Sequence, residues 1–290
     1  MKKMSKLLCM LLALAMVFAL CACGNSSDAD VPNEYGTVTP GKLTVAISPD
    51  YPPFEFYTLD ENSNPVLAGT DPSLAQYIAD YLNLELEVIL IDFDGVLNEL
   101  AAGKVDLAVS CLSPDPSRTE SMDFSISYIT SENGGQSFVT TQDKVDLFPT
   151  LEDASNPNYK IGAQNGSIQL DLANLYAADA DIIPLAKATD IVADLLSGKM
   201  DGAFLEESVA ENFAANYAEL VVLHAVPYDV DGNAVGVVKG NAALLEGVNA
   251  AIAAALEDGS IDKFVAEADE LSKGTVYIRD EDGNIVEDAG

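Results

Sequence analysis

The sequence predicts an α/β protein whose fold is divided into two lobes with a cleft between them. Short runs of β-type residues alternate with segments of helical periodicity, which is typical of α/β layers. This alternation occurs twice, and extended segments near residues 136–141 and 235–239 join the two sets. The chain has 290 residues, 49% of them apolar, so it can bury a large core.

The first set begins after a polar N-terminal stretch. Apolar and β-branched runs predict strands, and apolar residues at helical spacing predict helices. The predicted elements are strands at 43–47, 86–91 and 106–109 and helices at 74–82 and 96–101. The run from Ser110 to Arg118 therefore follows the carboxyl end of a strand, where open α/β sheets usually bind ligands.

The second set has the same character. Its predicted elements are strands at 159–163, 201–205, 221–223 and 234–238 and helices at 166–175, 191–196 and 244–256. We expect residues 42–138 and 235–272 to form the first lobe and residues 139–234 to form the second. Two crossover strands then connect the lobes.

The N-terminus predicts export. Three lysines precede an apolar run that is too short for a membrane-spanning helix, so residues 1–22 are expected to be a signal peptide. Leu20 to Cys23, followed by Gly24, resembles the lipobox of bacterial lipoproteins. Cys23 is the expected lipidation site and Cys21 a weaker candidate, with ordinary secretory cleavage as the alternative. Residues 23–41 are polar without hydrophobic period and predict a flexible spacer.

Removal of the signal peptide changes the cysteine and charge counts. Cys9 and Cys21 are removed and Cys23 is expected to be lipidated, so Cys111 is left as a single thiol, which excludes an intrachain disulfide. The remaining chain has 11 basic and 47 acidic residues, a net charge of −36. Such a charge argues against nucleic acid as a partner and against binding of an anionic bilayer by the protein surface. Residues 273–290 are expected to be an acidic tail that forms a small hairpin or stays disordered.

Arg118 is one of only two arginines in the chain, the other being Arg279. Its guanidinium presents donors in a rigid fork that matches a carboxylate, and the serines just before it can add further donors. This pattern indicates a clamp for a small carboxylate. The alternative is a surface arginine paired with one of many nearby acidic residues.

Four separated motifs point to a family. They are residues 51–56 (Tyr-Pro-Pro-Phe-Glu-Phe), residues 69–75, residues 103–118 with Phe124, Ser125 and Tyr128, and residues 198–206 with 238–241 and 258–260. In their order and spacing, residues 42 to about 271 resemble the extracytoplasmic amino-acid-binding proteins of ABC importers, the solute-binding proteins of family 3. Thr70 departs from the pattern, since the family usually has an aromatic residue there.

The resemblance implies a type II periplasmic-binding-protein fold and the capture of an amino acid for ABC permease subunits. It implies no enzymatic activity, no cofactor and no metal. With the predicted lipid anchor, the expected protein is a monomer held at the extracytoplasmic face of the cell membrane. The single histidine, His224, is expected to be structural.

The resemblance also assigns the site that binds the ligand's carboxylate. Arg118 falls on the arginine that binds the α-carboxylate, and Ser110 and Ser113 fall on residues that contact the ligand. Ser167 and the amide of Ile168 would complete this end of the site from a helix start, where an anion is favoured. For Ser167 the alternative is a plain helix cap.

The other end of the ligand is assigned in the same way. Glu206 falls on the acidic residue that pairs with the α-ammonium, with a simple helix-dipole role as the alternative. Tyr51 and Phe93 fall on side chains that enclose the ligand's side chain, with core packing as the alternative. Ser48 and Cys111 fall on positions that shape this part of the pocket.

Departures from the family pattern bear on specificity. Ser48 stands where binders of cationic amino acids often have an aspartate, which predicts a non-basic ligand. Cys111 replaces a smaller residue, Glu206 replaces the more usual aspartate, and Ile168 removes a hydroxyl.

The expected mechanism is closure of the second lobe over a ligand docked on the first. Two alternatives stay open. One is a dehydratase of the cyclohexadienyl type, with Glu206 as general acid; the other is a ligand-sensing receptor domain.

Overall fold

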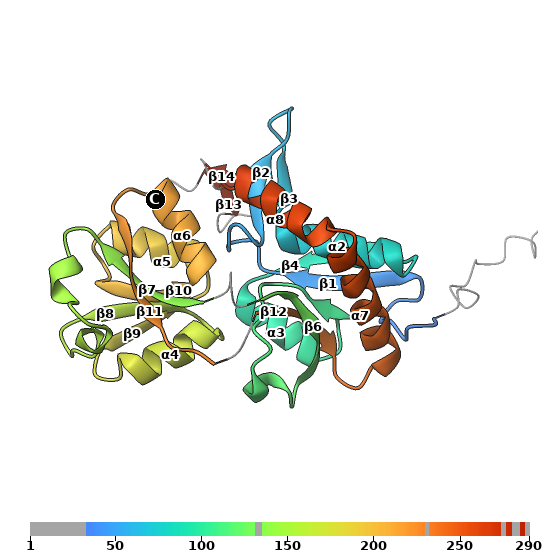
Figure 1. The fold of residues 1–290 in the computed structure, drawn as a ribbon, viewed down its shortest axis with the longest axis horizontal. Coiled ribbons are helices and arrows are strands. Elements are labelled where there is room, and N and C mark those ends of the chain that lie inside the picture. Colours follow the sequence, from blue (N-terminus) through green and yellow to red (C-terminus); the bar gives the residue numbers. More distant parts are fainter. Residues whose placement is uncertain (1–32, 131–134, 230–231, 274–276, 280–284, 288–290) are drawn as a thin grey trace, which may run out of the picture. The chain divides into compact units, whose positions relative to one another are not determined.

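The computed structural model describes residues 33–130, 135–229, 232–273, 277–279 and 285–287. Residues 33–290 form one compact unit. The described strands of this unit form three sheets, and Figure 1 shows them together with the helices that pack on them. None of the helices in the described ranges is long and apolar enough to cross a membrane.

The first sheet has the strand order β4-β1-β5-β12-β6. Its strands are β4 (Glu85–Leu90), β1 (Lys42–Ile47), β5 (Leu107–Ala108), β12 (Asn233–Val238) and β6 (Met122–Ile129). The strand β1 is parallel to β4 and β5, whereas β12 is antiparallel to β5 and β6. The segment from residue 48 and the segment from residue 109 therefore leave the sheet at the same edge.

Helices cover both faces of this sheet, because successive strand residues point to opposite sides. Val45 and Ile47 belong to a hydrophobic cluster with residues of α2 (Thr70–Tyr81) and α7 (Ala242–Glu257). Ala46 belongs to another cluster with α3 (Phe93–Ala101). The helix α8 (Ser260–Leu271) packs against α2 and α7.

The second sheet has the strand order β11-β7-β10-β8-β9. Its strands are β11 (Leu220–Val226), β7 (Gln136–Thr141), β10 (Gly202–Glu206), β8 (Lys160–Gln164) and β9 (Asp181–Leu185). Phe138 and Phe204 pack on one face with α4 (Ile168–Tyr176). Ala203 and Leu205 pack on the other face with α5 (Ala188–Leu196) and α6 (Glu207–Asn216). The short 3₁₀ helices η4 (Val145–Leu147) and η5 (Leu151–Ala154) lie between β7 and β8 in the chain.

The chain passes between the two sheets twice, after β6 ends at residue 129 and after β11 ends at residue 226. The lobe boundaries expected after residues 138 and 234 instead fall inside β7 and β12. The extended segments expected to be crossovers are thus strands within the two sheets. All six residues of β7 are buried. Without an alternation of exposed and buried residues, the sequence of β7 does not distinguish a sheet strand from an extended connection between lobes.

A third, smaller sheet has the order β14-β13-β2-β3. It consists of β2 (Phe56–Leu59), β3 (Pro65–Ala68), β13 (Tyr277–Arg279) and β14 (Ile285–Glu287). Tyr277 pairs with Tyr57, so the described part of the acidic tail adds to the β2–β3 hairpin. The expected α/β class is confirmed, and the expected strands and helices are present within a few residues of their predicted bounds. The β2–β3 hairpin, β6, β9, α6 and α8 were not among the predicted elements.

Candidate functional site

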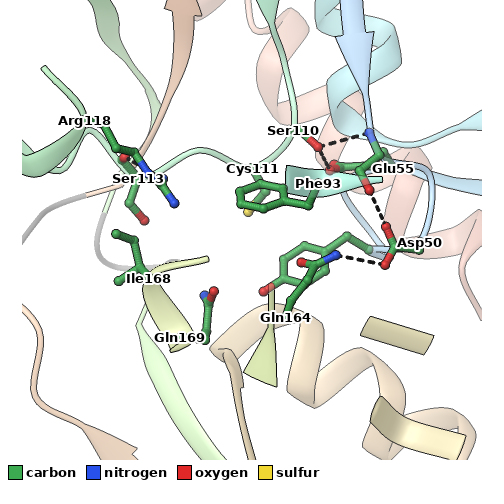
Figure 2. Close-up of a pocket in the computed structure, with 12 residues that line it drawn as sticks. Asp50, Glu55, Phe93, Ser110, Cys111, Ser113, Arg118, Gln164, Ile168 and Gln169 are labelled. Carbon is green, nitrogen blue, oxygen red and sulfur yellow. Dashed lines mark hydrogen bonds between the residues drawn. The ribbon is translucent and has the colours of Figure 1, made fainter. Parts of the chain in front are cut away.

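A pocket lies where the two large sheets face each other at their strand ends (Figure 2). It is lined by Ser48, Asp50, Tyr51, Glu55, Phe93, Ser110, Cys111, Ser113, Arg118, Gln164, Ile168 and Gln169. Eight of these twelve are residues expected from the sequence. Asp50, Glu55, Gln164 and Gln169 were not expected, and neither Ser167 nor Glu206 is among the lining residues.

Arg118 lies at one end of the pocket with its guanidinium directed inward (Figure 2). The side chain is 9% exposed, and its guanidinium carbon lies 5.7 Å from the centre of the Phe93 ring. Nη1 donates to the carbonyl of Ser113 at 3.3 Å, and Nη2 donates to the carbonyl of Gly166, across the pocket, at 3.2 Å. Among the residues that the structure describes, Arg118 forms no ion pair, which argues against a surface ion-pairing role.

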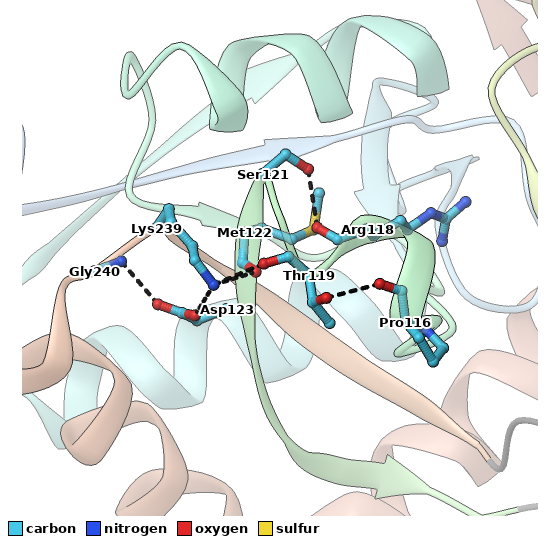
Figure 3. A network of polar contacts seen from close by, with 8 residues as sticks. All are labelled: Pro116, Arg118, Thr119, Ser121, Met122, Asp123, Lys239 and Gly240. Carbon is cyan, nitrogen blue, oxygen red and sulfur yellow. Dashed lines mark hydrogen bonds and ion pairs between the residues drawn. The ribbon is translucent and has the colours of Figure 1, made fainter.

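The backbone that presents Arg118 is held by a polar network (Figure 3). Arg118 ends the 3₁₀ helix η2 (Pro116–Arg118), and the Ser121 hydroxyl donates to its carbonyl at 2.9 Å. Beyond it, Asp123 pairs with Lys239 at 2.6 Å and accepts from the amide of Gly240 at 2.8 Å. The arginine is therefore fixed to the far end of β12. Burial lowers the pKa of its guanidinium, which nevertheless stays charged.

The start of helix α4 faces Arg118 from the second sheet. Ser167 is the N-cap, because its hydroxyl accepts from the amide of Leu170 at 3.2 Å, and it donates to the carbonyl of Gln164 at 2.7 Å. The predicted helix-cap alternative for Ser167 is thus the role seen here. Ile168 and Gln169 follow in the first turn, where amides have no helical acceptor and favour an anion.

Asp50 lies at the opposite end of the pocket. One carboxylate oxygen accepts from the Ser48 hydroxyl at 2.6 Å; the other accepts from Gln164 Nε2 at 3.0 Å and from the Ala188 amide at 2.5 Å. The side chain is only 5% exposed. Burial raises the pKa of Asp50 to about 6, although these hydrogen bonds and attraction to Lys187 act the other way.

A second carboxyl group lies beside it in the pocket wall. Glu55 accepts from the Ser110 hydroxyl at 2.6 Å, and the same Ser110 oxygen accepts from the Ser48 amide at 3.2 Å (Figure 2). Burial, and then repulsion from Asp71, raise the pKa of Glu55 well above its usual range. Burial beside other acidic groups thus favours the protonated form of Glu55.

Asp71 anchors the loop that contains Cys111. It accepts from the Cys111 amide at 2.6 Å and from the Tyr128 hydroxyl at 2.7 Å. Asn233 donates to both the carbonyl and the sulfur of Cys111, each at 3.1 Å, while Cys111 itself has a positive φ of 48°. Burial raises the pKa of the Cys111 thiol, so the thiol is neutral in this wall.

Glu206 caps a helix next to the pocket. Its carboxylate accepts from the amide of Val209 at 3.0 Å, and its own amide donates to the Tyr51 hydroxyl across the pocket at 3.2 Å. The side chain is 2% exposed, and burial raises the pKa of its carboxyl to about 8. Glu206 therefore favours its neutral, protonated form at pH 7.

His224 lies outside the pocket. It stacks on Phe138 and hydrogen-bonds the carbonyl of Phe148 at 2.8 Å through Nε2. These contacts fit the expected structural role. Within the described ranges, no group of three or more histidine, cysteine or acidic residues is placed to hold a metal ion.

Comparison with known proteins gives consistent matches. The family model for bacterial extracellular solute-binding proteins, family 3, matches residues 43–267. The arginine-binding extracellular protein ArtP of Bacillus subtilis is 31% identical over 214 residues, which are 72% of this chain and 76% of that protein.

Solved structures of amino-acid-binding proteins have the same fold as this chain. The amino acid ABC transporter substrate-binding protein AbpA of Streptococcus pneumoniae, bound to L-arginine, superposes with a TM-score of 0.75 and 32% identity, over 80% of this chain and 96% of that one. An ancestral amino-acid-binding protein described as a precursor of cyclohexadienyl dehydratase superposes with a TM-score of 0.68 and 27% identity, over 78% of this chain and 95% of that one. The expected type II periplasmic-binding-protein fold is confirmed.

Proposed function

Because the chain belongs to family 3 of the bacterial extracellular solute-binding proteins, we propose that it captures an amino acid in the pocket and delivers it to the permease of an ABC importer. The observation that supports this function best is the polarity of the pocket. A buried guanidinium, Arg118, lies at one end, and the buried carboxyl of Asp50 lies at the other. A zwitterion with a side chain can span such a pocket with each charge facing its opposite.

The α-carboxylate binds at Arg118. The guanidinium donates to the backbone carbonyls of Ser113 and Gly166, which are weaker acceptors than a carboxylate. The first-turn amides of α4 at Ile168 and Gln169 complete this end from the second sheet. Ser113 contributes here too, whereas Ser167 supports the site through its cap.

The α-ammonium binds near Glu206. This carboxyl lies close enough to Tyr51 and Cys111, which both line the pocket, to raise their pKa values. Contact with an ammonium group would favour the ionised form of Glu206 and so remove its proton on binding. Phe93 and Tyr51 then flank the ligand's side chain.

The side-chain end favours a cationic amino acid. The expectation of a non-basic ligand rested on Ser48, but Ser48 donates its hydroxyl to Asp50, which supplies a carboxylate two residues further along. Asp50 lines this end of the pocket, and with a pKa of about 6 it is ionised at pH 7 and would face a cationic group of the ligand. The similar protein ArtP is named as arginine-binding, and AbpA was solved with L-arginine bound, which supports a cationic ligand.

Capture proceeds by closure of the cleft. Among the described elements, the chain passes between the two large sheets after β6 and after β11, so rotation of one sheet relative to the other would open the pocket. Export and lipid anchoring at Cys23 would hold the protein at the extracytoplasmic face of the membrane. Cys23 and the signal peptide lie outside the described residues.

A ligand pair with the same shape tests this function. L-citrulline matches L-arginine except that a neutral ureido group replaces the guanidinium. Calorimetry on residues 24–290 should give about tenfold or tighter binding for L-arginine, because hydrogen bonds to charged groups contribute about 1.5–3 kcal/mol. Equal or tighter binding of L-citrulline would contradict a cationic ligand. Absence of binding for every amino acid, in a screen where a ligand at 100 times Kd stabilises by about 2.7 kcal/mol, would contradict the function itself.

One observation favours a second function. Glu206 has a pKa of about 8, so it holds a proton at neutral pH as a general acid must, and one similar structure is a precursor of a dehydratase. Turnover of prephenate or arogenate, followed by product absorbance, tests this alternative. Turnover that Glu206→Gln abolishes would establish it.

A further inference from the structure

Asp50 connects the two sides of the cleft. It follows β1 of the first sheet, and its carboxylate accepts from Gln164 Nε2 and from the amide of Ala188. Both donors belong to the second sheet's side, 114 and 138 residues further along the chain. The contact therefore depends on how far the cleft is closed rather than on local chain geometry.

The amide of Ala188 is the first of helix α5. The N-cap residue of this nine-residue helix is Lys187, whose side chain makes no capping hydrogen bond. An ammonium group can only donate, so it cannot accept from a helix amide. The neighbouring hydroxyl Oγ1 of Thr189 is buried and has no hydrogen-bond partner among the described residues. The N-cap side chain on the second side thus offers no acceptor to the free amides at the start of α5, and Asp50 supplies an acceptor for the amide of Ala188.

Asp50 is itself fixed by the first side. Ser48 donates to its other oxygen at 2.6 Å, the Ser48 amide donates to Ser110, and Ser110 donates to Glu55. Figure 2 shows this series of hydrogen bonds running along the pocket wall to Asp50 and on to Gln164. An acceptor that is held in this way before closure loses little further freedom when the helix start arrives.

We propose that Asp50 is a positioning residue that caps helix α5 from the opposite side of the cleft, so that closure over the ligand completes a helix that is uncapped in the open form. This inference rests on the proposed function for the closing motion. It assigns Asp50 a role in retaining the ligand that is separate from any attraction to the ligand's charge.

Two substitutions separate the cap from the charge. Asp50→Asn removes the charge but keeps an oxygen that can accept from Ala188, since asparagine is as good a cap as aspartate. Asp50→Ala removes both. A cap typically contributes about 1 kcal/mol and at most about 2 kcal/mol, which corresponds to about 5- to 30-fold in an equilibrium constant. We expect Asp50→Ala to weaken binding of both L-arginine and L-citrulline by about 5- to 30-fold, chiefly through faster dissociation, and Asp50→Asn to weaken binding of L-citrulline less than Asp50→Ala does.

Hydrogen exchange gives a readout that loss of stability alone would not move. In the wild type, L-arginine should slow exchange of the Ala188 amide; Asp50→Asn should preserve this slowing and Asp50→Ala should abolish it. The matched control is Asn241→Ala, which removes the N-cap of α7, a bond to Leu244 within the first side. This control should lower the melting temperature but leave the ligand-dependent slowing at Ala188 intact.

The two hypotheses fail differently. If the wild type binds L-arginine but Ala188 exchanges equally with and without it, or Asp50→Ala retains full affinity for both ligands, the cap proposal is overturned. If the wild type binds no amino acid, the proposed function fails instead. The cap is then judged on the empty protein by small-angle scattering, where Asp50→Ala should be more open than wild type and Asp50→Asn should not. Identical scattering of all three would overturn it.

Discussion

The two sides of the pocket are built differently. The first sheet's side supplies nine of the twelve lining residues, whereas the second side supplies only Gln164, Ile168 and Gln169. The first side consists of loops held by buried side chains such as Asp71. The second side presents the starts of α4, α5 and α6. We call the first sheet's side the preformed side, because its contacts do not depend on closure. We call the second sheet's side the cover, because its helix starts reach the ligand only when the cleft closes.

The largest expected effect is on the preformed side. Arg118→Ala should reduce ligand affinity by about 3–5 kcal/mol, because the ligand's carboxylate would be buried without its partner. Lys104→Ala is the matched control, since Lys104 is an exposed cation on the same side, paired with Glu99. Calorimetry should show unchanged binding for the control. Comparable losses in both variants would mean that general charge, rather than a carboxylate seat, governs binding.

The next largest effect tests whether Glu206, the buried acid of the cover, binds the ligand's ammonium group. Glu206→Gln should cost about 1.5–3 kcal/mol of affinity, the value of a hydrogen bond to a charged group. In the wild type the pKa of about 8 means that Glu206 is protonated below that pH, so binding of an ammonium must release a proton and affinity should rise from pH 6 to pH 8.

Proton release is measured directly by calorimetry in buffers of different ionisation enthalpy at pH 7. Glu206→Gln should remove the release, and Glu207→Gln, the adjacent acidic residue, should retain it. A wild-type binding enthalpy that does not depend on the buffer would rule out Glu206 as the ammonium partner.

The smallest effect compares two glycines of the cover. Gly166 and Gly198 have φ values of 74° and 73°, so an alanine at either position is strained by about 1–2 kcal/mol. A side chain at Gly166 would also lie 3.1 Å from Oδ1 of Asp94 on the preformed side, whereas nothing lies within 4 Å at Gly198. Both variants should lose similar thermal stability, but only Gly166→Ala should also lose affinity. Equal affinities would show that the two sides do not approach at Gly166 in the bound form.

Much of the preformed side could be predicted from the sequence. Arg118 was identifiable because arginine is scarce in the chain and because the motif around it follows a predicted strand. The strands and helices were predictable wherever apolar residues kept a clear period, as in β1 and α7. The lobe boundaries were placed inside β7 and β12 because a fully buried strand and an extended connection have the same sequence pattern.

The cover was harder to predict, because its contacts join residues far apart in the chain. Asp50 is one of 47 acidic residues, and nothing local distinguishes it from a solvated carboxylate. Its importance comes from Ala188 and Gln164, which only the folded chain brings close. Gln164 and Gln169 gave no signal either, since neutral amides at strand and helix ends are common. Ser48 could be singled out from the sequence, but the Asp50 carboxylate that accepts its hydrogen bond could not.

Chemical modification of the Cys111 thiol offers a way to follow opening of the cleft. Once the chain begins after residue 23, Cys111 is its single cysteine, and it lines the pocket with 9% of its surface exposed. Because Cys111 lines the pocket, a wider pocket would expose more of its sulfur to a thiol reagent. The rate at which a fluorinated or chromogenic reagent modifies Cys111, measured with and without ligand, would therefore report how far the ligand shields the pocket, and a tag left at this position would turn the protein into a reporter of its own occupancy.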